Sequence, residues 1–569
     1  MTRALFWLPA LLVLGATTVA AQEEARILVQ ADKSKGTVVR ELFGTEIKCA
    51  QGADGLMTGL RGAANDFQPA VMDWVRPLQP GFMRYKFMRG SWNWEDGIGP
   101  MGARKDDPAR QKVMGVDEIM AFQRTVIGDA STCHLVVSPR NPEQGAALVA
   151  YLNFPADPKG RDRVLGVSKE NGRDYRTAGY WAALRAQHGH PEPYEVVWFE
   201  LGNENYLKDG GFNRDSRSYL EATREVVKAM KAVDPSVRCG LNLDCSPIKN
   251  QDWRVRVTEE GGDFADYFIA HSYYPFAYPR NSRYVKATTN LDRLQVEELY
   301  YKMIMAGAHQ ACSDWRWFRD QLKRTTRGGS IPLCLTENGF HLEVHDARAQ
   351  NTVLVGVYDA DLIGMMVEHA RELGLASANL FFLQGDDPWA FLQHSFARRD
   401  ASAISVRSPY WSLYLWTHYF GSTLLTTDVR CGTFAIPFPQ GDDWPKEGVY
   451  WSRIAAQEGI PLLSAHSSLS ADGKTLSLIV INRDLYQDRE TRVELNGFLP
   501  ETSGSVHTLN SSVTAASRKT EEQFAVWDSN NEDAPGTVKI RDSRIENVGR
   551  TFRWRFPAHS ATAIVLRSR

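Results

Sequence analysis

Eight short apolar runs, each followed by polar or glycine-containing sequence, constrain the fold of this chain more than any other feature. Each run has the length of a buried β-strand, and helical patterns lie between the runs. The runs are Leu42–Glu46, Phe82–Lys86, His134–Ser138, Val196–Leu201, Val237–Asn242, Tyr267–His271, Leu333–Glu337 and Asn379–Gln384. A strand and a helix repeated eight times over about 340 residues predict a (β/α)8 barrel.

Two of the intervals between runs carry clear helical patterns. Ser218–Val233 places apolar residues on one face and ends before Asp234 and Pro235. The pattern at Thr352–Leu373 ends before Gly374, a residue type that commonly follows the last helical turn. Both intervals are therefore expected to be amphipathic helices that pack against the barrel.

The sequence changes character on either side of the repeats. Over residues 409–569 helical periodicity fades and short strand-like segments alternate with turns, which predicts an antiparallel β-sandwich. Short strands within residues 22–40 are expected to join this sandwich, and residues 510–533 are expected to form a long exposed loop. The predicted fold class is α/β, a (β/α)8 TIM barrel over residues 41–408 with an additional antiparallel β-sandwich domain.

The first residues bear on the location of the protein. Arg3, the apolar run Ala4–Leu14 and the small residues Val19–Ala21 have the layout of a signal peptide over residues 1–21. We therefore expect a secreted or periplasmic protein. No later stretch reaches the roughly 18 consecutive apolar residues that indicate a membrane helix.

Charge and cysteine content limit the expected partners. A formal net charge of −2 gives no reason to expect nucleic acid or a membrane surface as a partner, whereas a homo-oligomer stays open. Of the seven cysteines, Cys239 and Cys245 are near enough in sequence to pair, whereas Cys133 and Cys334 are expected to be buried thiols. No CxxC or HExxH spacing occurs, so neither a metal nor a cofactor is expected.

Two glutamates stand at the ends of the fourth and seventh runs. Because the carboxyl ends of barrel strands hold the active site, Glu204 and Glu337 are expected to converge across the barrel mouth. Retaining glycoside hydrolysis needs one carboxylic acid that protonates the leaving oxygen and one carboxylate that attacks the sugar. The sequence therefore predicts Glu204 as the catalytic acid/base and Glu337 as the nucleophile, with Asn203 bound to the sugar 2-hydroxyl.

The segments around both glutamates resemble motifs of clan A glycoside hydrolases, and most of all family 51, the α-L-arabinofuranosidases. The segments that carry the resemblance are Val197–Glu204, Leu335–Glu337, Leu42–Glu46, Arg84, Trp94–Pro100 and His271–Tyr274. The resemblance spans residues 36–496 and implies a barrel with a β-sandwich. It also implies an exo-acting α-L-arabinofuranosidase that acts on plant-type polysaccharide by double displacement.

The same motifs supply candidate contacts with an oligo- or polysaccharide substrate. The candidate substrate-binding residues are Glu46, Arg84, Trp94, Asn203, His271, Tyr273 and Gln384. His271 is expected to support the nucleophile by hydrogen bonding, with Tyr273 or Tyr274 beside it. Trp94 either stacks on a sugar face or packs within its own loop.

One segment departs from the family pattern. After the second-strand arginine the family usually has a Pro-Gly-Gly-Asn run that allows close approach of the sugar, whereas this chain has Lys86–Gly90. These mostly bulky or cationic residues predict a differently shaped pocket. Lys86 and Arg89 either form salt bridges with Glu95 or Asp96, which is the favoured interpretation, or recognise an acidic or sulfated sugar.

Two groups of alternative functions stay open. An endo-glucanase, a xylosidase or a glycosidase of acidic glycans would keep the mechanism and change the substrate. A non-catalytic carbohydrate-binding barrel belongs to another class. The presence of both glutamates argues against it, because a protein that only binds sugar needs neither an acid nor a nucleophile.

Overall fold

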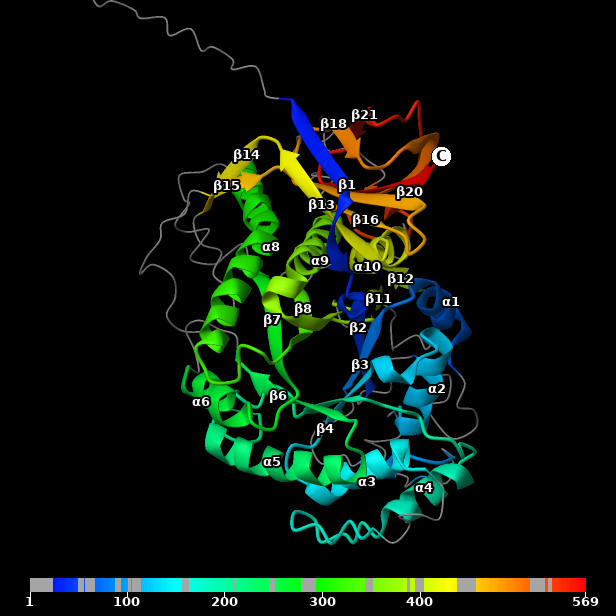
Figure 1. The fold of residues 1–569 in the computed structure, drawn as a ribbon, viewed down its shortest axis with the longest axis vertical. Helices are drawn as coiled ribbons and strands as arrows, with labels where there is room; N and C mark the ends of the chain where they lie inside the picture. Colours follow the sequence, from blue (N-terminus) through cyan, green and yellow to red (C-terminus); the bar gives the residue numbers. More distant parts are fainter. Residues whose placement is uncertain are drawn as a thin grey trace, which may run out of the picture.

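The computed structural model of this chain describes most of its length. The described residues are 24–49, 56, 67–86, 94–100, 104, 114–155, 163–208, 210–244, 251–277, 293–342, 352–385, 389–393, 404–436, 457–511, 528–530 and 535–569. They form a closed barrel of eight strands and a separate nine-stranded sheet, with helices packed around the barrel and between the two (Figure 1). The expected signal peptide at residues 1–21 lies outside the described residues.

The barrel confirms the predicted fold class. Its eight strands pair in the order of the sequence and run parallel, and the last strand closes on the first. They are β2 (Gly44–Lys48), β3 (Phe82–Lys86), β4 (Cys133–Val137), β5 (Trp198–Leu201), β6 (Arg238–Leu243), β7 (Tyr267–Ala277), β8 (Leu333–Leu342) and β9 (Leu375–Leu380). Only β9 begins clearly earlier than predicted. Gly374, at a left-handed φ of 64°, turns the chain directly from a helix into this strand.

The described helices occupy the intervals between the barrel strands and the start of the second domain. They are α1 (Pro69–Leu78), α2 (Val116–Val126), α3 (Pro142–Asn153), α4 (Ala178–Gln187), α5 (Ser216–Val233), α6 (Gln251–Gly261), α8 (Arg293–Lys323), α9 (Val353–Leu373) and α10 (Ser408–Tyr419). Both predicted helices are confirmed as α5 and α9. The side chain of Asp215 caps α5 by accepting hydrogen bonds from two backbone amides of its first turn.

The second domain is built on one large sheet. Its strand order is β20-β19-β22-β17-β16-β13-β1-β18-β21, and neighbours run antiparallel except β1 and β18, which are parallel. The strands are β1 (Ala25–Thr37), β13 (Thr423–Arg430), β16 (Leu463–Leu469), β17 (Thr475–Asn482), β18 (Arg489–Asn496), β19 (Pro500–Ser511), β20 (Val538–Glu546), β21 (Thr551–Phe556) and β22 (Ser560–Ser568). The short strands expected within residues 22–40 are the single strand β1, whose register shifts between Gln30 and Ser34. Much of the loop expected at residues 510–533 lies outside the described residues.

Shorter strands complete the described part of the chain. They are β10 (Gln384–Gly385), β11 (Leu392–Gln393), β12 (Ser405–Val406), β14 (Thr433–Ile436) and β15 (Gln457–Pro461). Strands β10 to β12 form a three-stranded sheet that begins a few residues after β9, and β14 pairs with β15.

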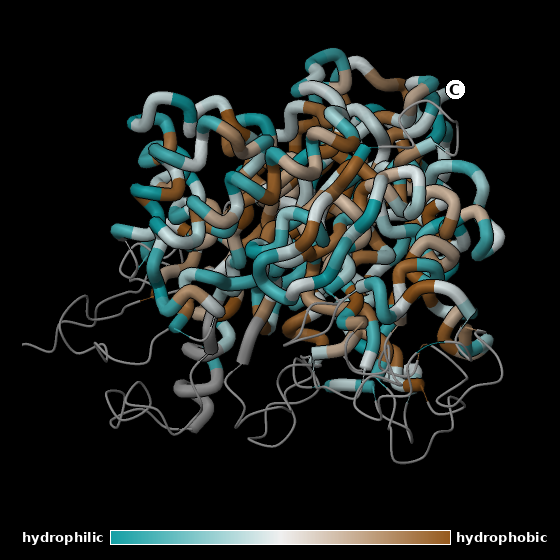
Figure 2. The backbone as a smooth tube through the Cα atoms, turned by 90° about the horizontal axis from the view of Figure 1, so that it is seen from below, coloured by the Kyte–Doolittle hydropathy of each residue, from teal (hydrophilic) through white to brown (hydrophobic). Residues whose placement is uncertain are grey.

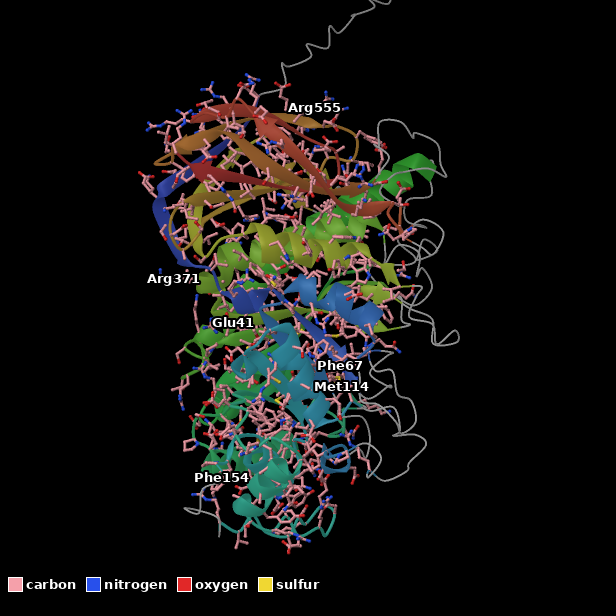
Figure 3. All side chains as sticks on the ribbon, turned by 90° about the vertical axis from the view of Figure 1, so that its right-hand side faces the viewer. Glu41, Phe67, Met114, Phe154, Arg371 and Arg555 are labelled. Carbon is pink, nitrogen blue, oxygen red and sulfur yellow. The ribbon has the colours of Figure 1, made fainter. Side chains whose placement is uncertain are left out.

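Helices α9 and α10 join the two domains. Strand β17 shows how: Ile479 and Ile481 belong to the large core shared with the barrel and its helices, whereas Leu478 and Val480 belong to a second core inside the sheet domain. This alternation is the period of two that a strand buried on both faces requires. Figure 3 shows the sheet domain stacked on one end of the barrel, and Figure 2 shows apolar segments mainly inside a largely polar outer surface.

The structure bears on two expectations from the sequence, the state of the cysteines and the presence of a membrane helix. Cys133 and Cys334 are buried free thiols, as predicted, and Cys239 is also free and buried. Cys245 lies outside the described residues. Among the helices that the structure describes, none is both long and apolar enough to span a membrane.

Candidate active site

The interior of the barrel is layered, because inward-facing residues recur at every second position of a strand. The lower layer is aromatic. The centre of the Phe82 ring lies 5.5 Å from that of His134 and 5.7 Å from that of Trp198. The centres of the Trp198 and Tyr267 rings are 5.0 Å apart. This layer fills the barrel floor. The next inward positions, towards the carboxyl ends of the strands, are charged.

Arg84 on β3 is the centre of the charged layer. Its guanidinium is fully buried and binds Glu200 on β5 through two parallel hydrogen bonds of 2.7 and 2.8 Å. It also donates to Glu337 at 2.7 Å, to Asn203 at 2.8 Å and to Glu46 on β2. One cation therefore holds three carboxylates from three strands in place.

Glu337 on β8 is almost enclosed by donors. Arg84 and Lys86 share its Oε1 atom, with Lys86 Nζ at 3.1 Å. The hydroxyl of Tyr273 on β7 donates to Oε2 at 2.6 Å, and His271 Nδ1 lies 3.4 Å from the same oxygen. These contacts fix the orientation of the carboxylate and stabilise its charged form.

Glu204 stands in a strained loop after β5. Gly202 and Glu204 have φ values of 85° and 50°, and a Cβ at position 202 would lie 1.9 Å from Asn205 Oδ1. The loop aims Glu204 at His271, whose Nδ1 lies 2.9 Å from Glu204 Oε1. Its side chain is 26% exposed, whereas that of Glu337 is 5% exposed.

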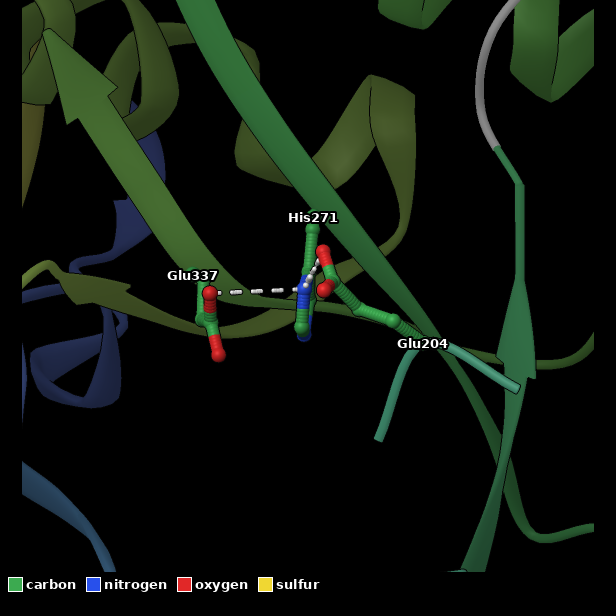
Figure 4. A group of neighbouring side chains, drawn as sticks. All are labelled: Glu204, His271 and Glu337. Atoms are coloured by element: carbon green, nitrogen blue, oxygen red, sulfur yellow. Dashed lines mark hydrogen bonds and ion pairs between the residues drawn. The ribbon is translucent and has the colours of Figure 1, made fainter. Parts of the chain in front are cut away.

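The two glutamates face each other across His271, as Figure 4 shows. One oxygen of Glu204, one oxygen of Glu337 and one ring nitrogen of His271 all lie within 4.8 Å of one another. Such a group also has the atoms of a metal site. Arg84 and Lys86 bring two positive charges to Glu337, however, and these disfavour a cation there.

The pKa values of the buried carboxyl groups are driven in opposite directions. Burial and the charge of Glu337 raise the pKa of Glu46. Burial would also raise the pKa of Glu337, but the charges of His271, Lys86 and Arg84 hold it well below its usual range. In the same way Arg84 lowers the pKa of Glu200 to about 2 against the effect of burial. Acidic groups with separated pKa values are typical of a catalytic site.

His271 is held in its charged form. Burial alone would lower its pKa, but the charge of Glu337 and hydrogen bonding with Glu200 and Glu204 raise it to about 9. The expected hydrogen-bonding support from β7 to the nucleophile comes from Tyr273. Tyr274 points elsewhere and donates to Asp314 on α8 at 2.9 Å.

The favoured interpretation of Lys86 is wrong. Lys86 pairs with Glu337, whereas Glu95 accepts from Tyr175 at 2.7 Å and from Arg173 at 3.2 Å. The reason is the period of β3, which turns residues 84 and 86 to the same inner face. Arg89, the other cation singled out in this segment, lies outside the described residues.

The expected sugar contact of Trp94 is not what the structure shows. Its indole is 2% exposed, donates to the carbonyl of Gln144 on α3 and packs 5.0 Å from the ring of Trp181 on α4. A ring covered by two helices offers no face to a sugar. Gln384, in contrast, lies in β10 next to the site, because the backbone amide of Leu383 donates to the backbone carbonyl of Glu46 at 3.0 Å.

Sequence reasoning did not identify Glu200 as a site residue. The signal was present: a carboxylate stands inside the apolar strand β5 and is fully buried. A charge in such a position needs a partner, and Arg84 is that partner. Lys48 was also missed, although it lies two residues beyond Glu46 on the same face of β2.

An eight-stranded parallel barrel with facing glutamates at the ends of β5 and β8 defines a glycoside hydrolase. A protein-family model described as the α-L-arabinofuranosidase 1 domain matches residues 74–293. The chain is a glycoside hydrolase whose sequence and fold are similar to those of clan A family 51, as the relatives below also indicate.

Relatives extend this similarity beyond the matched domain. An intracellular exo-α-(1→5)-L-arabinofuranosidase 1 from Bacillus subtilis is 27% identical over 388 residues, which are 62% of this chain and 69% of the relative. A probable α-L-arabinofuranosidase C from Aspergillus niger is 22% identical over 538 residues, 88% of each chain. The crystal structure of the α-L-arabinofuranosidase from Thermotoga maritima matches with a TM-score of 0.70 at 19% identity, over 96% of this chain and 100% of that chain, which shows the shared fold.

Proposed function

We propose that this glycoside hydrolase is an exo-acting α-L-arabinofuranosidase that works by the retaining, double-displacement mechanism. One observation carries the mechanism: an oxygen of Glu204 and an oxygen of Glu337 lie within 4.8 Å of each other. Retaining enzymes hold their carboxyl groups about 5–5.5 Å apart, whereas inverting enzymes need about 6.5–9.5 Å to admit a water molecule.

In the first step Glu337 attacks the anomeric carbon. The bond between this carbon and the leaving oxygen breaks, and Glu204 gives its proton to that oxygen. Glu337 suits the attack because its pKa is held well below the usual range, so it is ionised at neutral pH. Glu204 suits the acid role because it is more exposed and lies on the other side of His271, where the leaving group departs.

In the second step water hydrolyses the glycosyl ester on Glu337. Glu204 takes one proton from the water, whose oxygen bonds to the anomeric carbon while the ester bond breaks. Asn203, which is anchored by Arg84 at 2.8 Å, stands beside Glu204 and is assigned to the sugar 2-hydroxyl. Such a contact strengthens in the transition state and so contributes to the rate.

Two further parts of the proposal concern substrate and location. The relatives named above are described as α-L-arabinofuranosidases, which supports terminal α-L-arabinofuranosyl groups as the sugars released. The plant-type polysaccharide that carries them is proposed from the sequence motifs alone. Export rests on the pattern of residues 1–21 alone, and the Bacillus relative is described as intracellular. Fractionation of the native host, followed by sequencing of the mature amino terminus, tests export: intact protein confined to the cytoplasm would contradict it.

Chemical rescue tests the mechanism. Glu204→Ala should lose activity on an activated aryl α-L-arabinofuranoside and regain it when azide is added, because azide needs no general base. Glu225→Ala, an exposed change on α5, serves as the matched control and should behave as the wild type. A mechanism-based cyclitol should label Glu337, as read by peptide mass spectrometry. Absence of rescue, or a label on another residue, would overturn the assignment.

A further inference from the structure

Glu200 on β5 has no direct part in the two chemical steps proposed above. Its side chain is fully buried, so no substrate reaches it, and burial alone would favour its neutral form. It is nevertheless ionised, because the charge of Arg84 and hydrogen bonding with His271 lower its pKa to about 2. Such a buried charge costs stability, and its role lies in what it does to its two partners.

The contact with Arg84 fixes the direction of the guanidinium. Glu200 binds Nε and Nη2, the two nitrogens of one edge, at 2.7 and 2.8 Å. A guanidinium is a rigid plane, so this edge sets where the remaining nitrogen points. That nitrogen, Nη1, donates to Glu337 at 2.7 Å and to Glu46, and Nη2 also reaches Asn203 at 2.8 Å. Glu200 therefore directs Arg84 at the nucleophile.

The side chain beneath Glu200 is uncharged. The hydroxyl of Tyr267 donates its single proton to the carbonyl of Phe199 at 2.8 Å, so its oxygen accepts from Nε2 of His134 at 2.8 Å. Burial lowers the pKa of His134 to about 4, and the ring is therefore neutral at pH 7. Glu200 lies 3.8 Å from this nitrogen and gains no counter-charge from it.

His271 on β7 is the second cation that faces Glu200. Its Nε2 atom lies 3.9 Å from an oxygen of Glu200. Its Nδ1 atom lies 2.9 Å from Glu204 and 3.4 Å from Glu337. The described charged groups around this ring are Glu200, Glu204 and Glu337, with Arg84 and Lys86 bound to Glu337 from β3. One imidazolium thus connects the buried carboxylate with both reacting glutamates.

The first step of the mechanism moves a negative charge from one neighbour of His271 to another. Glu337 gives up its charge when it bonds to the anomeric carbon, and Glu204 becomes a carboxylate when its proton passes to the leaving oxygen. Arg84 and His271 stabilise these charges only if both stay charged and in place. The charge of Glu200 is constant throughout, and a fixed counter-charge in a buried site needs no reorganisation of water.

We infer that Glu200 is a positioning residue: by holding one edge of Arg84 and facing His271, it keeps both cations charged and directed at the reacting glutamates through both chemical steps. This inference rests on the retaining mechanism proposed above and adds to it a residue that does not touch the sugar. Because Glu200 acts through its two partners, its loss should change the proton affinity of His271 as well as the rate.

The proton affinity of His271 gives a test that needs no activity. Hydrogen exchange at the C2 position of the ring, followed over a range of pH by peptide mass spectrometry, reports its titration midpoint, which we expect at about 9 in the wild type. Glu200→Gln removes a neighbouring negative charge, so this midpoint should fall by at least about one pH unit.

Asp361→Asn is the matched control for this measurement. Asp361 is also fully buried and binds Nε and Nη2 of one arginine, Arg483, in the same manner as Glu200 binds Arg84. The control variant loses a buried carboxylate of the same kind outside the active site. It should therefore leave the His271 midpoint in place.

Rates supply the second arm. On an aryl α-L-arabinofuranoside, Glu200→Gln should lower kcat/KM by about a hundredfold. The alkaline limb of its pH profile should also move to lower pH, because Glu204 and His271 both lose a proton more easily when a nearby negative charge is gone. Asp361→Asn should keep this limb, and its kcat/KM at low temperature should stay near that of the wild type.

Two results overturn this inference. One is a folded Glu200→Gln variant whose His271 midpoint is unchanged. The other is a kcat/KM that is unchanged in this variant or falls by the same factor at every pH, as a loss of packing alone would produce.

If Glu200→Gln does not fold, as shown by its thermal transition, Glu200→Asp decides. This variant keeps the charge but draws the carboxylate back by one methylene, so it no longer reaches both nitrogens of Arg84. Its kcat/KM should fall by at least about tenfold, and a wild-type value would overturn the positioning role.

Failure of the proposed function would be a different result. A wild type that cleaves no aryl α-L-arabinofuranoside overturns the proposed substrate, and the rates are then compared on the aryl glycoside that it does cleave. The His271 midpoint decides on Glu200 in either case, because it is measured without substrate.

Discussion

Two buried arginines, Arg84 in the barrel mouth and Arg483 between the domains, show how differently this chain uses the same residue. Arg483 follows β17 and binds one carboxylate, Asp361 on α9, through bonds of 2.7 and 2.8 Å, and its third nitrogen donates to a backbone carbonyl. Arg84 faces Glu46, Glu200 and Glu337 at once.

The difference separates a structural ion pair from a catalytic one. Charges and hydrogen bonds are matched around Arg483, so the pair holds two domains together and has nothing left to react. Around Arg84 the carboxylates outnumber the arginine, and their pKa values diverge. An imbalance of this kind costs stability, and it keeps one carboxylate available for chemistry.

The largest effect is expected in the barrel mouth. Glu337→Gln removes the nucleophile but keeps an acceptor of similar shape, so kcat/KM should fall by at least about 10⁴-fold. Its midpoint of thermal unfolding should fall modestly, because Arg84, Lys86 and the charged His271 lose a shared counter-charge but keep an acceptor of similar shape. Glu372→Gln, an exposed change on α9, is the control. Activity of the Glu337 variant above about 1% would contradict the assignment.

At the junction between the domains, we expect a substitution to lower stability and to leave activity almost unchanged. Arg483→Met leaves Asp361 buried without its partner and should lower the free energy of unfolding by about 3–5 kcal/mol. Activity at low temperature should stay near that of the wild type. Urea unfolding measures the first effect and initial rates the second. A second change, Asp361→Leu, should restore much of the lost stability, because it removes the unpaired carboxylate. A further loss of stability would contradict the explanation that an unpaired charge causes the first loss.

A smaller effect tests one donor of Glu337. Tyr273→Phe removes the 2.6 Å hydrogen bond that lowers the pKa of Glu337. We expect kcat to fall by about tenfold to a hundredfold. The acidic limb of the pH–rate profile should move to higher pH, because the nucleophile protonates more easily. Tyr274→Phe, whose hydroxyl binds Asp314 instead, should leave that limb in place.

The last prediction concerns the pH dependence of stability and a carboxyl group behind the site. Burial raises the pKa of Asp359 on α9 to about 8, although the amide of Phe340 donates to it at 3.3 Å. Folding therefore takes up a proton, and the free energy of unfolding should fall by up to about 1.4 kcal/mol per pH unit as the pH rises from about 4 to about 8. Asp359→Asn should remove this component in urea titrations at several pH values. The same slope in the variant would assign it to another group.

The sequence was sufficient for the barrel and for the two opposed glutamates, because both depend on local patterns. Apolar runs of strand length repeat along the chain, and Glu204 and Glu337 follow two of them directly. The partner of Lys86 was within reach too, since residues 84 and 86 of a strand face the same side. It was missed because Glu95 is near in sequence and Glu337 is not.

Other features depend on packing that no local pattern carries. Trp94 is covered by α3 and α4, and which helices close over an indole is decided by the whole fold. The parallel pairing of β1 with β18 is of the same kind, because the two strands are several hundred residues apart. The position of Glu46 relative to Glu337 likewise depends on barrel closure, which brings β2 beside β9.

The position of β1 between two strands from the end of the chain affects how the protein folds during its synthesis. Strand β1 lies between β13 and β18 inside its sheet and not at an edge, yet both neighbours are translated only after the entire barrel. At about 5–20 residues per second, the ribosome leaves β1 with both edges open for tens of seconds. An open, alternating apolar strand invites pairing with other nascent chains. Production of this protein should therefore depend on chaperones that shield the strand until the last residues emerge.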